Sequence, residues 1–584
     1  MSPRQDVLML LFQKSFPRTL EVLAGLAREG ELLEAWTFDD VKARRSAEKR
    51  LEDCGIQARV RSAYKPLLHA FLEELSLEDV ERVVVRYPLA PIGLADRFRL
   101  EAYPLAALVG DRELIFDRRS DDGLFYEVEL THSDGCHQVV EVLAPNHAHT
   151  GIHGEKLLSP TGWVRIDGRG PGARLESDLE LAFHETVREI ARHDWGTEEP
   201  FFEELNIRVE VPARDRELPF GDEVVSISEA LHEDLYFTLL EVFAKRTGRQ
   251  AGDRTLKPGQ IVPEISGGAE AVSVSVSLRE LDVEDIAGER MELEGAEDPP
   301  DAKQIRRVLD SLGGVRLSAP TRSGRQVLAC HVPGKDAAVM ISGGQHANEG
   351  TGIVGALRAG LELGTRDDSH FVLSPLENPD GYALFRRLVA GNPRHMHHAA
   401  RYTAFGDDME YRVEGVPGES LFETEIRSRS IAASGAKLHV TLHGYPAHEW
   451  VRPFSGYVPH GFEAWTLPKG FFLILRHHAG WREQAEALLE KVTSRLSDLS
   501  DVLALTARQL EIYRIHAGEP DLRMVNGFPC MVAEDPRSQA PVVLISEYPD
   551  ETVHGEDFRL GQDAQRRTAL AAYGAWQEIL PRSV

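Results

Sequence analysis

The sequence is poor in cysteine and in positive charge. Four of its 584 residues are cysteines, widely separated at Cys54, Cys136, Cys330 and Cys530. Such spacing fits buried thiols in a reduced cytoplasmic protein better than a disulfide framework or a thiolate metal site. With 94 acidic against 66 basic residues, the formal net charge is −28. That excess argues against nucleic acid or an anionic membrane as a partner, because both require a basic face.

Long apolar runs are also missing. No run approaches the roughly 20 apolar residues that span a bilayer, so a membrane partner is not expected. The apolar stretch VLMLLF at 7–12 is followed by Gln13 and Lys14, which does not fit the core of a secretory signal. We therefore expect a cytoplasmic location. A chain of this length exceeds what one hydrophobic core usually supports, which predicts about two to four domains.

Residues 1–290 predict an α+β or α/β region of unknown role, with two subdomains as one option. Apolar residues at helical spacing from 15 to about 75 predict helices. Short β-branched and aromatic runs from 80 to 145 predict a sheet, and RLEAYPLAALVG at 99–110 is among them. Further helices are expected at 175–195 and 229–248, separated by the strand NIRVEVPA.

Three histidines in this region have spacings that could chelate a metal. His147, His149 and His153 lie in NHAHTGIHGEK. The stretch is rich in loop-forming residues, and a site of this kind normally also needs a carboxylate and a rigid frame. Solvated loop histidines are the favoured interpretation.

The boundary between two regions is expected at 287–304, where acidic residues and a Pro-Pro pair interrupt the periodic pattern. Before it, AVSVSVSL at 271–278 alternates as a strand does and could form an edge. After it, AKQIRRVLDSLGG predicts a helix, and VRLSAP and QVLACHVPG predict two strands. We therefore expect a separate catalytic domain at 300–584.

The most specific stretch of the chain is ISGGQHANEG at 341–350. An apolar strand ends in two glycines and delivers His346 and Glu349 three residues apart. The following TGIVGALRAGLEL has the apolar spacing of a helix. Two later strands also end in polar residues: LHVTLHGY presents His443, and PVVLISEYPDE reaches Glu547. Before both of these strands, FVLSPLENPDGYALFRRL predicts a strand that runs into a turn at 378–381.

These residues together fit a hydrolytic zinc site. Zinc in hydrolases takes three His or Asp/Glu ligands and leaves a fourth position open. His346, Glu349 and His443 supply such a set, and in α/β sheets sites gather beyond the carboxyl ends of strands. Glu547, at another strand end, is available as the general base. Each residue alone also has an ordinary interpretation, such as a core histidine or a surface ion pair.

HANEG, ENPDGY, LHVTLHGY and VVLISEY resemble segments of the zinc carboxypeptidases, the funnelin family, over residues 300–584. The resemblance implies an α/β fold with a mixed, twisted sheet of about eight strands flanked by helices. It implies one zinc ion held by His346, Glu349 and His443, with Glu547 as catalytic base and acid. Arg401 matches the arginine that polarises the scissile carbonyl and stabilises the oxyanion, a role that suits a fixed guanidinium.

The segment RYTAFGDDMEYR at 401–412 departs from the family pattern. Glu410 and Tyr411 stand where the family usually has the Asn-Arg pair that clamps the substrate's terminal carboxylate. Arg412 could supply the clamp from one position later, and Arg394 is a second candidate for anion binding. A carboxylate at Glu410 would repel a free C-terminus and favour a cationic group.

Other residues of this half do not match the family's motifs directly. Tyr513 is a candidate for the family's capping tyrosine, although its spacing is wrong. His448 and Glu449 could orient a zinc ligand or lie beside a surface loop. HMHH at 395–398 and the pair at 477–478 fit loop or helix-face histidines.

The sequence therefore predicts a zinc metallopeptidase, exopeptidase-like with atypical terminal-group recognition, acting on a peptide or small amide. In this hypothesis zinc and Glu547 activate water, and zinc and Arg401 stabilise the oxyanion. Two alternatives remain: a deacylase of N-acyl amino acids, as in the desuccinylase and aspartoacylase branch, and a non-catalytic binding or scaffold protein. The oligomeric state is left open.

Overall fold

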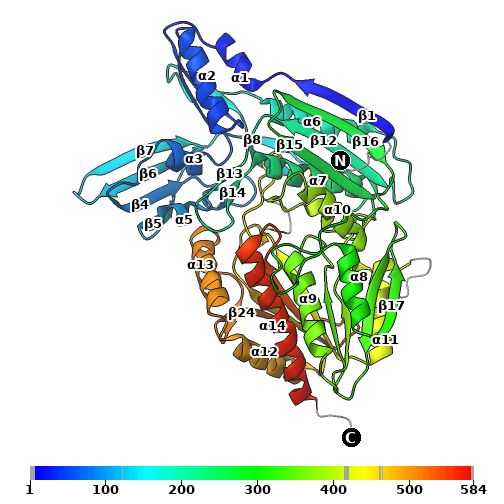
Figure 1. Ribbon diagram of the computed structural model, residues 1–584. Helices are drawn as coiled ribbons and strands as arrows, with labels where there is room; N and C mark the ends of the chain where they lie inside the picture. The colour runs from blue at the N-terminus through cyan, green and yellow to red at the C-terminus, as the bar shows by residue number, and fades with distance from the viewer. Residues whose placement is uncertain are drawn as a thin grey trace.

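The computed structural model describes residues 7–580, except 122, 251, 413–419, 459–461 and 463–464. In Figure 1 the first half of the chain, blue to green, lies above the second half, green to red. Within the described residues no helix combines the length and the apolar character that crossing a membrane requires.

The second half is built on one mixed sheet of nine described strands in the order β17-β18-β20-β19-β21-β25-β22-β24-β23. Its strands are β17 (Val315–Pro320), β18 (Gln326–Val332), β19 (Val339–Gly343), β20 (Phe371–Ser374), β21 (Leu438–Tyr445), β22 (Phe472–His477), β23 (Arg523–Val525), β24 (Phe528–Glu534) and β25 (Val542–Pro549). The central strands β20, β19, β21 and β25 run parallel. Their nearly continuous apolar runs fit strands that are buried on both faces. The predicted α/β fold is confirmed, with nine strands in place of about eight.

Helices cover both faces of this sheet. They are α8 (Ala302–Ser311), α9 (Gly350–Leu363), α10 (Pro379–Val389), α11 (Glu425–Ser434), α12 (Arg482–Leu496), α13 (Ser500–Ala517) and α14 (Gly555–Ile579). α9, α12 and α14 pack together on one face, and α11 covers the other near β18 and β20. Gly352 lets α9 approach β21 closely, because a Cβ there would lie 2.5 Å from the Leu442 carbonyl oxygen. That contact brings the start of α9 next to the end of β21.

The described residues of the first half form three four-stranded sheets and two strand pairs. The first sheet, in the order β1-β16-β12-β15, comprises β1 (Val7–Phe16), β16 (Val272–Arg279), β12 (Glu204–Val211) and β15 (Gln260–Gly267). The second comprises β11 (Ala173–Arg174), β10 (Trp163–Ile166), β2 (Leu32–Thr37) and β3 (Gln57–Ser62). The third comprises β5 (Glu113–Arg118), β4 (Val80–Tyr87), β6 (Phe125–His132) and β7 (His137–Leu143). The pairs are β8 (Asn146–Thr150) with β9 (Lys156–Pro160), and β13 (Arg216–Glu217) with β14 (Val224–Val225).

The helices of the first half are α1 (Thr19–Val22), α2 (Val41–Asp53), α3 (Pro66–Glu73), α4 (Arg97–Glu101), α5 (Leu105–Val109), α6 (Asp178–Arg192) and α7 (Ile227–Arg246). α7 is buried on nearly all sides, as expected of a helix that is not amphipathic. Its Leu231, Tyr236 and Phe237 belong to the same hydrophobic core as Tyr402 and Trp450 of the second half. The two halves are therefore joined by shared core packing at α7.

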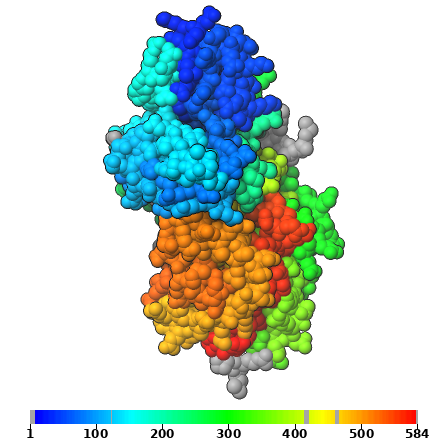
Figure 2. Space-filling view, turned by 90° about the vertical axis from the view of Figure 1, so that its left-hand side faces the viewer, coloured from blue at the N-terminus to red at the C-terminus, as the bar shows by residue number. Residues whose placement is uncertain are grey.

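A second contact joins the halves on the face shown in Figure 2. There the orange segment that includes α13 lies directly below the cyan and blue segments of the first half. Arg99 donates hydrogen bonds to the carbonyl oxygens of Arg514 (3.0 Å) and Ile515 (2.7 Å). His516 accepts a hydrogen bond from the Ala106 amide at 3.2 Å. Main-chain oxygens of α13 thus contact α4, and the His516 side chain contacts α5.

Several local predictions were wrong. The region 15–75 contains strands β2 and β3 as well as helices, and 99–110 forms α4 and α5. In the stretch 99–110 the apolar residues pack inward from short helical turns. A short apolar run is compatible with a helix or a strand, and tertiary contacts decide which one forms. β16 is not an edge strand, because it pairs with both β1 and β12. The stretch 378–381 begins α10, where the Asn378 side chain accepts from the Gly381 amide.

The expected division near residue 290 stays a proposal. β16 ends at Arg279 and α8 begins at Ala302, so residues 280–301 connect them without a helix or strand, and the interrupted pattern at 287–304 overlaps the first three residues of α8.

Candidate metal centre

Three local structures deliver His346, Glu349 and His443 to one point. β19 ends at Gly343, and Gly344 turns the chain with a φ of +60°, a conformation that favours glycine. His346 follows in the resulting loop, and Glu349 is the N-cap residue immediately before α9. His443 lies near the carboxyl end of β21, the strand parallel to β19. All three side chains are buried.

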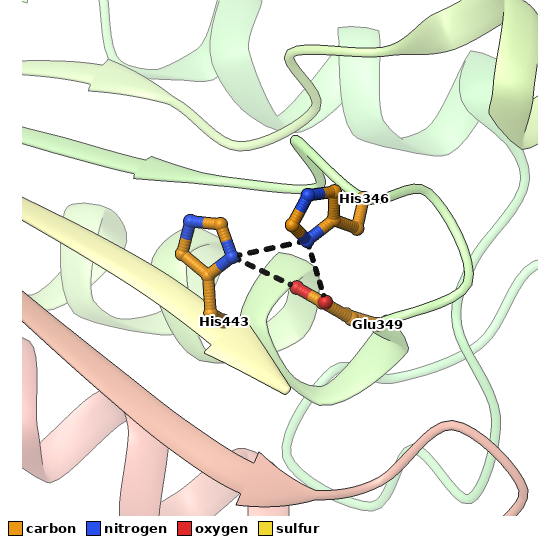
Figure 3. Close-up of side chains that lie close together, drawn as sticks. All are labelled: His346, Glu349 and His443. Carbon is orange, nitrogen blue, oxygen red and sulfur yellow. Dashed lines mark hydrogen bonds and ion pairs between the residues drawn. The ribbon is translucent and has the colours of Figure 1, made fainter. Parts of the chain in front are cut away.

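The ligand atoms of these residues converge, as Figure 3 shows. His346 Nδ1 lies 2.7 Å from Glu349 Oε1 and 3.3 Å from His443 Nδ1. His443 Nδ1 lies 3.2 Å from Glu349 Oε2. Within the described part of the chain, this is the one group of three His, Cys, Asp or Glu side chains close enough to hold a metal ion.

The donor set fits zinc. Zinc binds imidazole nitrogen at about 2.0–2.1 Å, so two ligand atoms of a tetrahedral site lie about 3.3 Å apart. The separations of 3.3 and 3.2 Å match that value, and the His346 Nδ1–Glu349 Oε1 separation of 2.7 Å is shorter. Glu349 Oε2 and His346 Nε2 are buried without a hydrogen-bond partner. A buried carboxylate that faces one imidazole with each oxygen, one of these oxygens having no hydrogen-bond partner, is the arrangement a cation would complete.

Neighbouring charges act strongly on these groups. Burial and Arg401 lower the pKa of His346, but Glu349 and Asp408 outweigh them and raise it to about 9. Burial raises the pKa of Glu349, but His346, Arg401 and His443 together hold it far below its ordinary value. Glu349 is therefore ionised, as a metal ligand must be.

Glu547 faces the same space from the neighbouring strand. β21 and β25 pair in parallel with His443 opposite Glu547. Both residues, with His346, line a cavity of about 210 Å³. Burial and the charge of Glu349 raise the pKa of the Glu547 carboxyl. Such a carboxyl can hold and release a proton near neutral pH, as the predicted general base requires.

Arg401 lies at the cavity wall between two carboxylates. Its Nη1 donates to Glu349 Oε1 at 2.8 Å and to Glu551 Oε1 at 2.7 Å. These contacts fix the guanidinium beside the three candidate ligands. Glu551 was not found by sequence reasoning, although it follows Glu547 by four residues.

Glu410 and Tyr411 both line the cavity, and the predicted effect of Glu410 on a free C-terminus stays a prediction. Its carboxylate accepts hydrogen bonds from Arg427 at 3.0 Å and Arg476 at 3.1 Å. Burial raises the pKa of Glu410, but these two arginines hold it well below its usual range. Its negative charge is therefore balanced by two arginines. Tyr411 is 37% exposed.

Arg412 and Arg394 are not placed for the predicted anion clamp. Arg412 is buried and binds Asp407 through two nitrogens, at 2.7 and 2.8 Å, and also contacts Glu423. Arg394 pairs with Asp222 at 2.9 Å. Neither residue is among the described residues that line the metal cavity.

The cavity has further walls that the sequence did not reveal. They are formed by Arg254, His398, Trp450, Trp465, Arg476 and Arg537. Arg254 comes from the first half of the chain, so that half borders the site directly. Isolated arginines and aromatics far apart in sequence carry no periodic signal, so they could not be assigned from the sequence.

Other candidate residues have structural partners. His448 is buried and binds Glu229 at 2.8 Å, and Glu449 forms an ion pair with Lys65, so neither lies on a surface loop. Tyr513 packs with Leu100 and Leu467 away from the cavity lining.

The remaining candidate histidines lie on strands or in buried segments, although they were expected in loops or on helix faces. His147 and His149 lie on strand β8, where their rings stack 5.1 Å apart, and His149 contacts Ser159. The favoured loop interpretation was therefore wrong for these two. His477 closes β22, and the segment 395–398 is buried.

Comparison with known proteins gives structural matches only. No protein-family model matches the chain, and no curated protein matches its sequence. A provisionally named metallopeptidase from Shewanella amazonensis is 14% identical over 51% of this chain and 99% of its own, with a TM-score of 0.29. A metallo-carboxypeptidase from Burkholderia cenocepacia is 14% identical over 53% of this chain and 73% of its own, with a TM-score of 0.28. A metallo-carboxypeptidase from Pseudomonas aeruginosa is 13% identical over 52% and 72%, with a TM-score of 0.27. Matches this distant assign no activity to the chain.

Proposed function

We propose that this protein is a zinc-dependent hydrolase that cleaves a peptide or amide bond at or near the end of a small substrate. One observation carries the proposal: His346 Nδ1, His443 Nδ1 and the Glu349 carboxylate converge, and both histidines line a cavity that Glu547 also lines. Two imidazoles and a carboxylate with an open side are the ligand set of catalytic zinc sites.

The residues have distinct roles in this proposal. His346, Glu349 and His443 would hold one zinc ion, which when bound supplies Lewis acidity and lowers the pKa of water. Glu547 accepts the proton of the attacking water and returns it to the leaving amine, because its raised pKa suits both steps. Arg401 presents a fixed guanidinium to the oxygen on which negative charge develops.

The cavity walls support a small or terminal substrate. Trp450 and Trp465 from the second half and Arg254 from the first enclose the space around the ligands. Arg476 and Arg537 also line it, so an anionic group is compatible with the pocket even though Glu410 is near. Terminal-group recognition thus differs from the Asn-Arg clamp and uses arginines from other strands and loops.

The test is metal analysis combined with a substrate screen. Protein purified without added metal is analysed by plasma mass spectrometry, and zinc-loaded protein is incubated with peptide and N-acyl amino-acid libraries. We expect one zinc per chain and cleavage that Glu547→Gln abolishes. Glu534→Gln, an exposed glutamate on β24, is the matched control and should remain active.

The outcomes separate the alternatives. Cleavage confined to N-acyl amino acids identifies a deacylase. Wild-type protein that binds no metal, or a Glu547→Gln variant with full activity, contradicts the hydrolytic proposal and favours a binding protein.

A further inference from the structure

A carboxylate from the first half of the chain reaches a histidine of the metal cavity. Glu233 on α7 is completely buried, and its Oε2 lies 2.5 Å from His398 Nδ1. Its Oε1 lies 3.4 Å from the backbone amide of His398. The role proposed for the zinc site uses neither residue.

His398 lines the cavity together with His346 and Glu547. Its ring lies 4.5 Å from the Trp450 ring and 5.3 Å from the Phe237 ring, measured between centroids. These two ring contacts restrict the rotation of the His398 side chain. Because Nδ1 faces Glu233, Nε2 lies on the opposite edge of the ring.

One face of α7 is built to hold this segment. Glu229, Glu233 and Phe237 follow one another at four-residue spacing and therefore lie on the same side of the helix. Glu229 accepts a hydrogen bond from the Met396 amide at 2.9 Å, Glu233 contacts His398, and Phe237 packs on the His398 ring. The same segment continues to Arg401.

Stability alone does not explain two buried carboxylates on this face. Burying a charged or polar group is costly, and replacing buried ionic pairs by apolar residues of similar size is often neutral or stabilising. A role in positioning His398, which lines the cavity, explains why a carboxylate is buried here.

We propose that His398 contacts the bound substrate through Nε2, and that Glu233 of α7 is the positioning residue that fixes its ring. The inference rests on the proposed hydrolytic site and deepens it, because it gives the first half of the chain a part in that site. The group recognised is an oxygen acceptor of the substrate, such as a carbonyl or carboxylate oxygen.

The protonation state supports a donor at Nε2. Burial, together with the charge of Glu229, raises the pKa of Glu233 well above its ordinary value. Burial lowers the pKa of His398 to about 4. Both groups are then neutral near pH 7. Oε2 of Glu233 lies 2.5 Å from Nδ1, so a proton on Oε2 leaves Nδ1 unprotonated and the proton of His398 on Nε2.

The first experiment reads the tautomer directly. Zinc-loaded protein labelled with 15N-histidine is studied by NMR, with His398 assigned from the spectrum of His398→Gln. We expect a protonated Nε2 and an unprotonated Nδ1 in wild type. Glu233→Gln should preserve this pattern, because its amide donates to Nδ1 as the carboxylic acid does, and Glu233→Leu should lose it. An unprotonated Nε2 in wild type overturns the inference.

The second experiment measures contact with a ligand. Acetohydroxamate, a small zinc ligand that carries a carbonyl oxygen, is titrated into the same samples. We expect the His398 Nε2 signal to shift in wild type and in Glu233→Gln. Saturation of the site without any change at His398 overturns the inference, and this result does not depend on hydrolytic activity.

Kinetics complete the test once a substrate is found. His398→Leu and Glu233→Leu should each lower kcat/KM by about 10- to 100-fold, the effect of losing one well-placed hydrogen bond. Glu233→Gln should stay within about threefold of wild type, and zinc content should be unchanged in all three. His516→Gln, a buried histidine outside the cavity lining, is the control.

The results distinguish this inference from the function itself. A zinc protein that cleaves no substrate contradicts the proposed function, while the NMR result still decides the role of His398. An active wild type with an equally active His398→Leu overturns the inference alone.

Discussion

His443 and Glu547 lie directly opposite each other in the register of the parallel strands β21 and β25. Side chains at paired positions of neighbouring strands point to the same face of the sheet. One candidate zinc ligand and the candidate base therefore lie on the same face of the sheet, at the same position along the two strands. A shift of the register by one residue would turn one of them to the opposite face.

The first prediction concerns zinc and stability. Zinc binds the folded site and so stabilises it, by about 4 kcal/mol at a free concentration near 1,000 times Kd. We expect zinc to raise the melting temperature of metal-free wild type by several degrees, measured by calorimetry. His443→Asn should lose both the bound zinc and this increase. Equal increases in the two proteins would place the metal elsewhere.

The second prediction concerns Arg401. Replacing it with methionine leaves Glu349 and Glu551 buried without their shared cation. Removing one partner of a buried ionic network costs about 3–5 kcal/mol. We expect Arg401→Met to lower stability by about 3 kcal/mol in urea denaturation.

Glu551→Gln should recover part of this loss, because it removes one of the two uncompensated charges. A double-mutant cycle should therefore show a coupling energy of about 1–3 kcal/mol between the two sites. Additive effects would show that the Arg401–Glu551 contact contributes nothing.

The third prediction concerns Glu410. Glu410→Asn removes the carboxylate that Arg427 and Arg476 share, which makes the cavity more positive although Arg427 keeps its contact with Glu377. We expect turnover of substrates with a free terminal carboxylate to rise about tenfold relative to amidated analogues, equivalent to about 1.4 kcal/mol. Combining it with Tyr411→Arg should increase the preference further. An unchanged substrate profile would show that these two positions do not contact the terminal group.

The fourth prediction separates Arg412 from substrate binding. Arg412→Met breaks its contacts with Asp407 and Glu423, both buried. Because the carboxylates then lose their partner, stability should fall by about 3 kcal/mol. The ratio of activities on free and amidated substrates should remain that of wild type at a temperature where the variant is folded. A changed ratio would restore Arg412 as a clamp residue.

Strongly patterned stretches were predictable from the sequence. ISGGQHANEG was expected to be a strand, a tight turn and a helix start, and β19, Gly344 and α9 confirm this arrangement. Short apolar runs were less predictable. RLEAYPLAALVG forms α4 and α5, and the stretch that begins with Asn378 opens α10. Period and turn residues alone do not distinguish these outcomes, because packing against distant residues decides between them.

The sequence by itself determined the α/β character of residues 300–584 and the residues that could bind zinc, because strand periodicity and the order of His346, Glu349, His443 and Glu547 are local properties. Only the tertiary structure decided the charge of the pocket. Arg427 and Arg476 neutralise Glu410, although they lie 17 and 66 residues away along the chain. It also revealed that Glu233 of α7 reaches His398. Such contacts arise from the packing of one half of the chain against the other, and no local pattern encodes them.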